Sequence, residues 1–216
     1  MSRQNPGTGG DQDSLPEPTV SRLPLYLRCL DRLYEACSPS IDSVTLAKMA
    51  GVAAHNLRKD LAYLGNLGVR GSGYDVGPLR EKITRILGAD QEWKIVICGV
   101  GNLGTAFANY LSRSKERFVL DALFDNNVNR IGERVAGVTV SPIETLPEVI
   151  SGNGSYLGII TTPPEVAFDI SRRLVSSGVR SMLNFAPVHI DLGEGTMVRN
   201  VDVGLHLLML SYHEML

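Results

Sequence analysis

Cysteine is scarce in this sequence, and long apolar runs are missing from it. The 216 residues include three cysteines, Cys29, Cys37 and Cys98. They form no CxxC pair and follow no recognisable signal peptide, so we expect no disulfide framework, no metal site and a cytoplasmic location. The longest apolar run, residues 201–210, is interrupted by Asp202 and His206 and falls short of the ~20 residues that span a bilayer. We therefore expect no membrane segment.

Excess charge of one sign is also missing overall, but the charge is unevenly distributed. The formal net charge is −2, with 44% hydrophobic and 20% charged residues, which is typical of a globular protein with one large or two small domains. Residues 21–87 carry ten Lys or Arg against six acids, whereas residues 88–216 carry ten against fourteen. The basic half suggests a polyanionic partner.

The first half of the chain has helical periodicity. Residues 1–20 are rich in Gly, Pro and Asp and are expected to form a disordered tail. Apolar spacing then predicts helices at residues 21–37, 43–49, 53–64 and 78–87, with Ser43 as the cap of the second. Two helices joined by Gly51 form a candidate helix-turn-helix, and the Gly-Ser-Gly turn in residues 69–76 suits a small hairpin, or wing. We place this domain at residues 21–88.

From residue 89 the pattern changes to alternating strands and helices. The continuous apolar run 95–98 predicts a buried parallel strand. Strands are then expected at 118–124, 138–140, 156–161 and 180–184, and helices at 103–112, 143–150 and 165–176. Such βα alternation predicts an α/β domain with a doubly wound parallel sheet over residues 89–200.

The turn after the first of these strands has the sequence G-x-G-x-x-G. Its residues are Gly99, Val100, Gly101, Asn102, Leu103 and Gly104. Because the motif follows a strand and opens a helix, it matches the dinucleotide fingerprint, in which free amides at the helix N-terminus face the pyrophosphate. Asp125 lies where the fingerprint places an acid on the ribose, and its charge favours NAD over NADP. The alternative is a glycine-rich turn that binds nothing, and Arg130 nearby is expected to be a solvated surface arginine.

The histidines give little support for an enzyme. A dehydrogenase needs an acid or base beside the nicotinamide. The four histidines are His55, His189, His206 and His213. His189 alone is plausibly placed, and no acid–base pair is visible. An NAD-dependent oxidoreductase with a helical appendage remains the alternative function.

The predicted third helix has side chains suited to DNA. Its exposed positions are expected to be His55, Asn56, Arg58 and Lys59. Asn and Arg can read base edges, while Lys59 and Arg70 in the wing suit phosphates. The alternative is an ordinary solvated helical face in which Asp60 supplies a local counter-charge.

With these motifs the chain resembles the Rex family of redox-sensing repressors. The resemblance covers residues 21–212 and rests on the segments 21–26, 57–61, 70–74, 99–104, 184–187 and 199–202. It implies a homodimer whose winged-helix domains bind an operator and whose Rossmann domains sense the NADH/NAD+ ratio, with NADH releasing the DNA. It also implies that the apolar segment 201–216 is a dimerisation helix exchanged between subunits.

The resemblance also implies specific site residues. It adds Thr161, Thr162, Pro163 and Asn184 to the cofactor-binding residues. It adds Ser43, Gly73 and Tyr74 to the DNA-binding residues. Asp202, Tyr110 and Arg22 are implied as a redox switch, although Asp202 is equally placed to cap the last helix. The sequence departs from the family at 54–56, at Leu64 and Leu67, and in the added proline of residues 161–164, which bears on operator preference and nicotinamide contacts.

Overall fold

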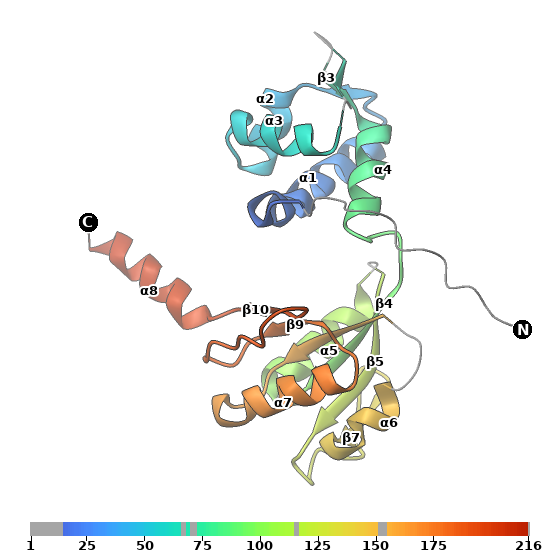
Figure 1. Cartoon of the computed structure of the whole chain (residues 1–216), viewed down its shortest axis with the longest axis vertical. Helices are drawn as coiled ribbons and strands as arrows, with labels where there is room; N and C mark the ends of the chain where they lie inside the picture. Colours follow the sequence, from blue (N-terminus) through green and yellow to red (C-terminus); the bar gives the residue numbers. More distant parts are fainter. Residues whose placement is uncertain (1–14, 66–67, 70–72, 115–116, 151–154, 216) are drawn as a thin grey trace, which may run out of the picture. The chain divides into compact units, whose positions relative to one another are not determined.

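The computed structural model describes residues 15–65, 68–69, 73–114, 117–150 and 155–215. The chain divides into two compact units, Met1–Asp90 and Gln91–Leu216 (Figure 1). The first is mostly helical and the second is built on a seven-stranded sheet. No helix of the described residues is long and apolar enough to cross a bilayer.

The first unit is a winged helix. Its elements are α1 (Glu17–Glu35), β1 (Ser40–Ile41), α2 (Ser43–Ala50), α3 (Ala54–Tyr63), β2 (Gly68–Val69), β3 (Gly73–Asp75) and α4 (Val76–Ile86). The three strands pair antiparallel in the order β1-β3-β2. Apolar residues at helical spacing, such as Leu23, Tyr26 and Leu30 of α1, are fully buried against Leu57 of α3 and Leu79 of α4. This core fixes α3 relative to α1.

Two expected boundaries in this unit were wrong. Helix α1 begins at Glu17, so residues 17–20 are not part of the expected 1–20 tail, and Thr19 is buried. The composition of the tail included Pro18, but proline is tolerated in the first turn of a helix because that turn needs no amide donor. Asp42, not Ser43, caps α2, because its Oδ1 accepts the amides of Val44 and Thr45 at 2.9 and 3.0 Å.

The second unit is a Rossmann-like sheet with helices on both faces. Its strands are β4 (Trp93–Cys98), β5 (Phe118–Asp125), β6 (Arg134–Val135), β7 (Val138–Pro142), β8 (Tyr156–Ile160), β9 (Ser181–Asn184) and β10 (Met197–Asn200). Its helices are α5 (Asn102–Arg113), η1 (Ile143–Thr145), α6 (Leu146–Ile150), α7 (Pro164–Ser176) and α8 (Val203–Glu214). The sheet order is β10-β9-β8-β4-β5-β7-β6, and every pair is parallel except β6 with β7. Strands β6 and β10 were not predicted.

The central strand β4 is buried on both faces. Ile95 and Ile97 pack in one core cluster with residues of α5, while Val96 and Cys98 pack in another with residues of α6 and α7. Successive strand side chains point to opposite faces, which is why a continuous apolar run is needed here. Because β4 pairs in parallel with β5 and β8, the carboxyl ends of these three strands lie together at one edge of the sheet.

Helix α8 is exposed along its whole length in this chain. Its apolar side chains include Leu205, Leu207, Leu208 and Leu210, each about 60% or more exposed. Asp202 caps the helix by accepting the Leu205 amide at 3.2 Å. This bond confirms the capping interpretation of Asp202. The exposed leucines make α8 an apolar surface in the isolated chain.

Candidate functional site

The glycine turn after β4 has the geometry of a phosphate-binding loop. Gly99 has φ +95°, and a Cβ there would lie 2.8 Å from the main chain of Thr161. A Cβ at Gly104 would collide with the Gly99 carbonyl oxygen, so both positions require glycine. At Gly101 the space for a Cβ is open. Helix α5 then begins without a side-chain cap, which leaves its first amides available to an anion such as a pyrophosphate.

Asp125, at the end of β5, is bonded to this loop. Its Oδ2 accepts the Val100 amide at 2.6 Å and its Oδ1 accepts the Asn127 amide at 2.8 Å. Each carboxylate oxygen has two lone pairs, so both oxygens keep capacity for a ribose hydroxyl. The acid therefore shapes the glycine turn and also faces the cleft beside it.

Arg130 is not the solvated surface arginine that we expected. Its Nε donates to the Val100 carbonyl and its Nη2 to Thr105 Oγ1, both at 3.0 Å. Its Nη1 forms an ion pair with Glu133 at 2.7 Å. The loop after β5 folds back over the glycine turn, which brings the guanidinium onto it.

The glycine turn opens into a cleft of about 950 Å³. Thr161, Thr162 and Pro163 line one side, as expected. The Thr161 hydroxyl is used internally, because it donates to the Gly99 carbonyl at 2.6 Å. The Thr162 hydroxyl is buried and has no hydrogen-bond partner among the described residues.

One face of α7 forms the far wall of the cleft. The lining residues on it are Val166, Asp169, Ile170 and Arg173. Their spacing places them on one face of the helix. Val166 and Ile170 are apolar, and Asp169 forms an ion pair with Arg173 at 2.8 Å. The sequence motifs missed these residues, although the helical spacing is visible in the sequence. The cleft thus joins a phosphate-binding end to a partly apolar wall, which suits an adenosine diphosphate.

Three expected cofactor residues do not line this cleft. Leu103 is half-exposed on α5, and Gly104 acts through close packing. Asn184 is fully buried, and its Nδ2 donates to Val188 O at 2.7 Å and to Asn200 Oδ1 at 2.8 Å. Its Oδ1 accepts the Ala186 amide, so the side chain is occupied in holding the loop after β9. Asn184 therefore does not line this cleft, and its expected role in cofactor binding stays a prediction.

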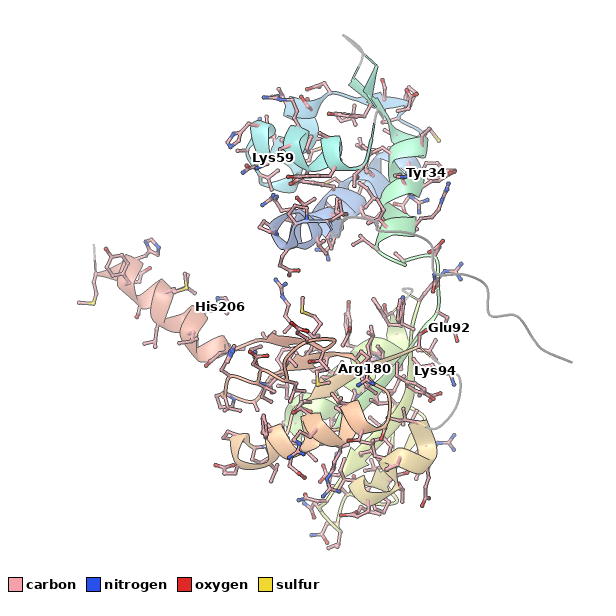
Figure 2. The ribbon with its side chains drawn as sticks, viewed as in Figure 1. Tyr34, Lys59, Glu92, Lys94, Arg180 and His206 are labelled. Carbon is pink, nitrogen blue, oxygen red and sulfur yellow. The ribbon has the colours of Figure 1, made fainter. Side chains whose placement is uncertain are left out.

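The first unit exposes a polar face on α3. His55, Arg58 and Lys59 are exposed and Asn56 is half-buried; Lys59 lies at the surface of its unit (Figure 2). Arg58 Nη1 donates to Ser43 Oγ at 3.3 Å, which joins two of the expected DNA-binding residues. The face is thus basic and polar, as a recognition helix requires.

The wing residues have different positions. Gly73 has φ +86° and packs so closely on Ile41 that a Cβ would collide with the Ile41 carbonyl oxygen, which gives it a structural role in the β1–β3 pairing. Tyr74 is half-buried and packs against the core of its unit. Arg70 lies outside the described residues.

Asp60 is not the solvated counter-charge considered above. It is 1% exposed and faces α1, where it accepts hydrogen bonds from Arg22, Tyr26 and Thr19. Burial raises the pKa of Asp60, but the bonds from Arg22, Tyr26 and Thr19 outweigh burial and hold that pKa below its usual value. Burial and the bond to Asp60 raise the pKa of Tyr26 well above its usual value. Arg22, expected in the switch, is thus paired within its own unit.

The other two expected switch residues lie in the second unit. Tyr110 is exposed on α5, and Asp202 caps α8.

Cys98 ends β4 directly before Gly99 and is fully buried, and burial together with the charge of Asp125 raises the pKa of its thiol to about 12.

Both units match known protein families. Residues 14–62 match the family model described as putative DNA-binding protein N-terminus, and residues 90–188 match the model described as CoA binding domain. The chain is 47% identical over 200 residues to the redox-sensing transcriptional repressor Rex of Streptomyces griseus, which covers 93% of this chain and 79% of that one. It is 38% identical to Rex of Carboxydothermus hydrogenoformans, over 92% of this chain and 96% of that one.

Solved structures agree with these relatives. The Rex-family repressor RSP in complex with NAD+ and operator DNA superimposes with a TM-score of 0.86 at 34% identity, covering 94% of this chain and 93% of that one. RSP in complex with NADH gives a TM-score of 0.80 at 32% identity, over 94% and 95% of the two chains. The relatives are named as repressors, not as enzymes. From its winged helix, its glycine-loop cleft and this similarity over nearly its whole length, the chain belongs to the Rex family of redox-sensing transcriptional repressors.

Proposed function

We propose that this chain represses transcription by binding operator DNA with its first unit and leaves the DNA when NADH occupies the cleft of its second unit. The observation that carries the proposal is the presence in one chain of an exposed polar helix on a winged-helix core and a glycine-loop cleft with an acid at its rim. Such a repressor works in the cytoplasm, with the DNA and the nucleotide pool, and needs no metal.

The proposed pose of the nucleotide follows from the donors and acceptors of the cleft. The pyrophosphate contacts the amides of the glycine turn and the start of α5. Asp125 accepts the ribose hydroxyls, and the adenine lies against Val166 and Ile170. Thr162, which also lines the cleft, packs against the nucleotide.

For DNA, we place α3 in the major groove. His55, Asn56 and Arg58 are positioned to contact base edges, and Lys59 and Ser43 to contact phosphates. The wing, with Arg70 and Tyr74, lies along the backbone or the minor groove.

The partner of α8 in this proposal is a second copy of the chain. Exposing Leu205, Leu207, Leu208 and Leu210 to water is unfavourable. Burying such side chains contributes about 1.5–3 kcal/mol each. Exchange of α8 between two subunits covers this surface and yields a symmetric dimer, which suits a palindromic operator.

The proposed switch uses Asp202, Tyr110 and Arg22. NAD+ has a positively charged nicotinamide ring and NADH a neutral one, so a carboxylate nearby responds to the oxidation state. Asp202 then exchanges a tyrosine hydroxyl for an arginine between two dimer arrangements, one favoured by NADH and one by the operator.

The test is a gel shift with a duplex that the chain itself selects from a random pool. NADH should release the duplex, whereas NAD+ at the same concentration should leave it bound. Coenzyme A is the control ligand. Its ribose 3′-phosphate would be repelled by the Asp125 carboxylate, so we expect coenzyme A not to bind. If NADH at saturation leaves the duplex bound, or if NADH is turned over as a substrate, the proposal is wrong.

A further inference from the structure

Arg130 lines the ribose end of the cleft, and three of its five N–H donors are engaged. It donates to Val100 O, to Thr105 Oγ1 and to the carboxylate of Glu133. These bonds direct the guanidinium at the glycine turn, although Arg130 also lines the cleft. The arginine is therefore close to the ligand, and most of its donors are directed at the glycine turn and at Glu133.

Arg130 and Asp125 hold the same residue from two sides. Asp125 accepts the amide of Val100, and Arg130 donates to the carbonyl of Val100. The positive and the negative side chain therefore flank one stretch of the glycine turn, where the fingerprint places the adenosine ribose. A phosphate on the ribose 2′-oxygen would meet both of them.

An arginine in this position normally favours a 2′-phosphate. A guanidinium binds a phosphate through two parallel hydrogen bonds, and an arginine near the acid is the usual feature of NADP sites. Here Glu133 competes with a phosphate for the arginine, because its carboxylate offsets the charge of the guanidinium and binds Nη1 at 2.7 Å.

Glu133 is itself held in place by the main chain. Its amide donates to Arg130 O at 3.1 Å, and its carbonyl accepts the Val140 amide at 2.9 Å, next to the β6–β7 hairpin. Asn127 fixes the other end of the same turn, because its carbonyl accepts the amides of Arg130 and Ile131. The main chain that carries both members of the ion pair is thus fixed in a tight loop, although the Glu133 side chain itself is 45% exposed.

We propose that Glu133 is a specificity-determining residue of the nucleotide site, which keeps Arg130 away from a ribose 2′-phosphate and so excludes NADPH. The proposal rests on the proposed function, because it takes the cleft as the NADH site. Asp125 repels the 2′-phosphate, and Glu133 withholds the cation that would offset this repulsion.

The experiment is calorimetric titration of the full chain with NADH and with NADPH. Glu133→Gln should strengthen NADPH binding by about tenfold, as expected for one charge-assisted contact to a phosphate, and should change NADH affinity by less than about twofold. Adding Arg130→Gln to this variant should remove the gain. Glu81→Gln is the matched control, since it breaks the exposed Arg85–Glu81 pair of α4, outside the cleft.

The outcomes separate the two proposals. An unchanged NADPH affinity in Glu133→Gln, or a gain that survives Arg130→Gln, overturns the role of Glu133. Equal weakening of NADH and NADPH, with a lower melting temperature, also overturns it and gives the ion pair a structural role only. If the wild type binds NADH, the proposed function stands in each of these cases. If the wild type binds neither nucleotide, the proposed function fails first and this inference with it.

Discussion

Arg22 and Asp60 form a two-pronged ion pair that joins α1 to α3, with both N···O distances at 2.7 Å. Tyr26 donates to the same carboxylate at 2.6 Å and Thr19 at 2.8 Å. The helix proposed to read DNA is therefore linked to the first helix by one buried carboxylate as well as by the apolar core.

We predict that Asp60→Ala destabilises the chain by about 2–4 kcal/mol. The substitution leaves the charge of Arg22 and two hydroxyls without an acceptor, although the partial exposure of Arg22 reduces the loss below that of a fully buried pair. Chemical denaturation of the full chain measures the effect. Glu81→Gln, which breaks an exposed pair, should cost under about 0.5 kcal/mol, and equal losses in the two variants would contradict the prediction.

The same carboxylate predicts a dependence of stability on pH. Because the folded-state pKa of Asp60 lies below its usual value, its contribution is complete above the ordinary aspartate pKa of about 3.9. The contribution is lost as pH falls through the lower, folded-state pKa. The free energy of unfolding of the wild type should thus fall more steeply on acidification below about pH 4 than that of Asp60→Asn. Parallel curves for the two proteins would rule out Asp60 as the cause.

Gly104→Ala should weaken NADH binding by at least about tenfold, the equivalent of losing one or two main-chain contacts. The added Cβ collides with the Gly99 carbonyl and must displace the turn. Calorimetry measures the affinity, and operator binding without nucleotide should stay normal. Gly77→Ala is the control, because a Cβ there meets nothing within 4 Å. A wild-type affinity for NADH in Gly104→Ala would show that the turn does not hold the pyrophosphate.

Replacing Arg58 and Lys59 together by alanine should abolish specific operator binding. A lost base contact is worth about 1–3 kcal/mol, and a lost phosphate contact lowers the slope of log affinity against log salt by about 1. Fluorescence anisotropy at several salt concentrations measures both. Lys82→Ala, an exposed lysine of α4, serves as the control. Normal operator binding by the double variant at matched salt would exclude this face of α3.

Substitutions at Asp202 can separate its charge from its cap. Asp202→Ala should bind NADH and still dimerise, but the effect of NADH on operator affinity should shrink by about tenfold or more. Asp202→Asn keeps a capping oxygen without the charge, so it should respond as poorly as alanine if the charge is the switch. A full NADH titration of operator release measures this. A wild-type response from Asp202→Asn would leave the cap as its only role.

Local signals in the sequence predicted most of the fold. Apolar runs and βα alternation indicated the parallel sheet, because strands that are covered by helices on both faces have nearly continuous apolar sequences. Strand β10, whose burial alternates, is short and lies at the sheet edge, so it has no such run. Asp and Ser are both favourable N-cap residues, so the sequence alone does not show whether Asp42 or Ser43 caps α2. The choice depends on the residue at which the helix begins.

The site was predicted where it is local in sequence and missed where it depends on folding. The glycine turn and Asp125 follow a known spacing. Arg130 reaches the turn only because residues 126–133 fold back over it, which no spacing indicates. Asp60 has the sequence pattern of a surface residue, and it is buried because α1 brings Arg22 and Tyr26 to it.

The burial of Cys98 has a consequence for how oxidants act on this protein. A thiol reacts with peroxide as the thiolate, and a pKa of about 12 leaves almost none of that form at neutral pH. A sulfenic or sulfinic acid at this position would push polar oxygen atoms into the apolar layer directly beneath Gly99. Burial and the raised pKa therefore protect the thiol at the strand end beneath the glycine turn from peroxide.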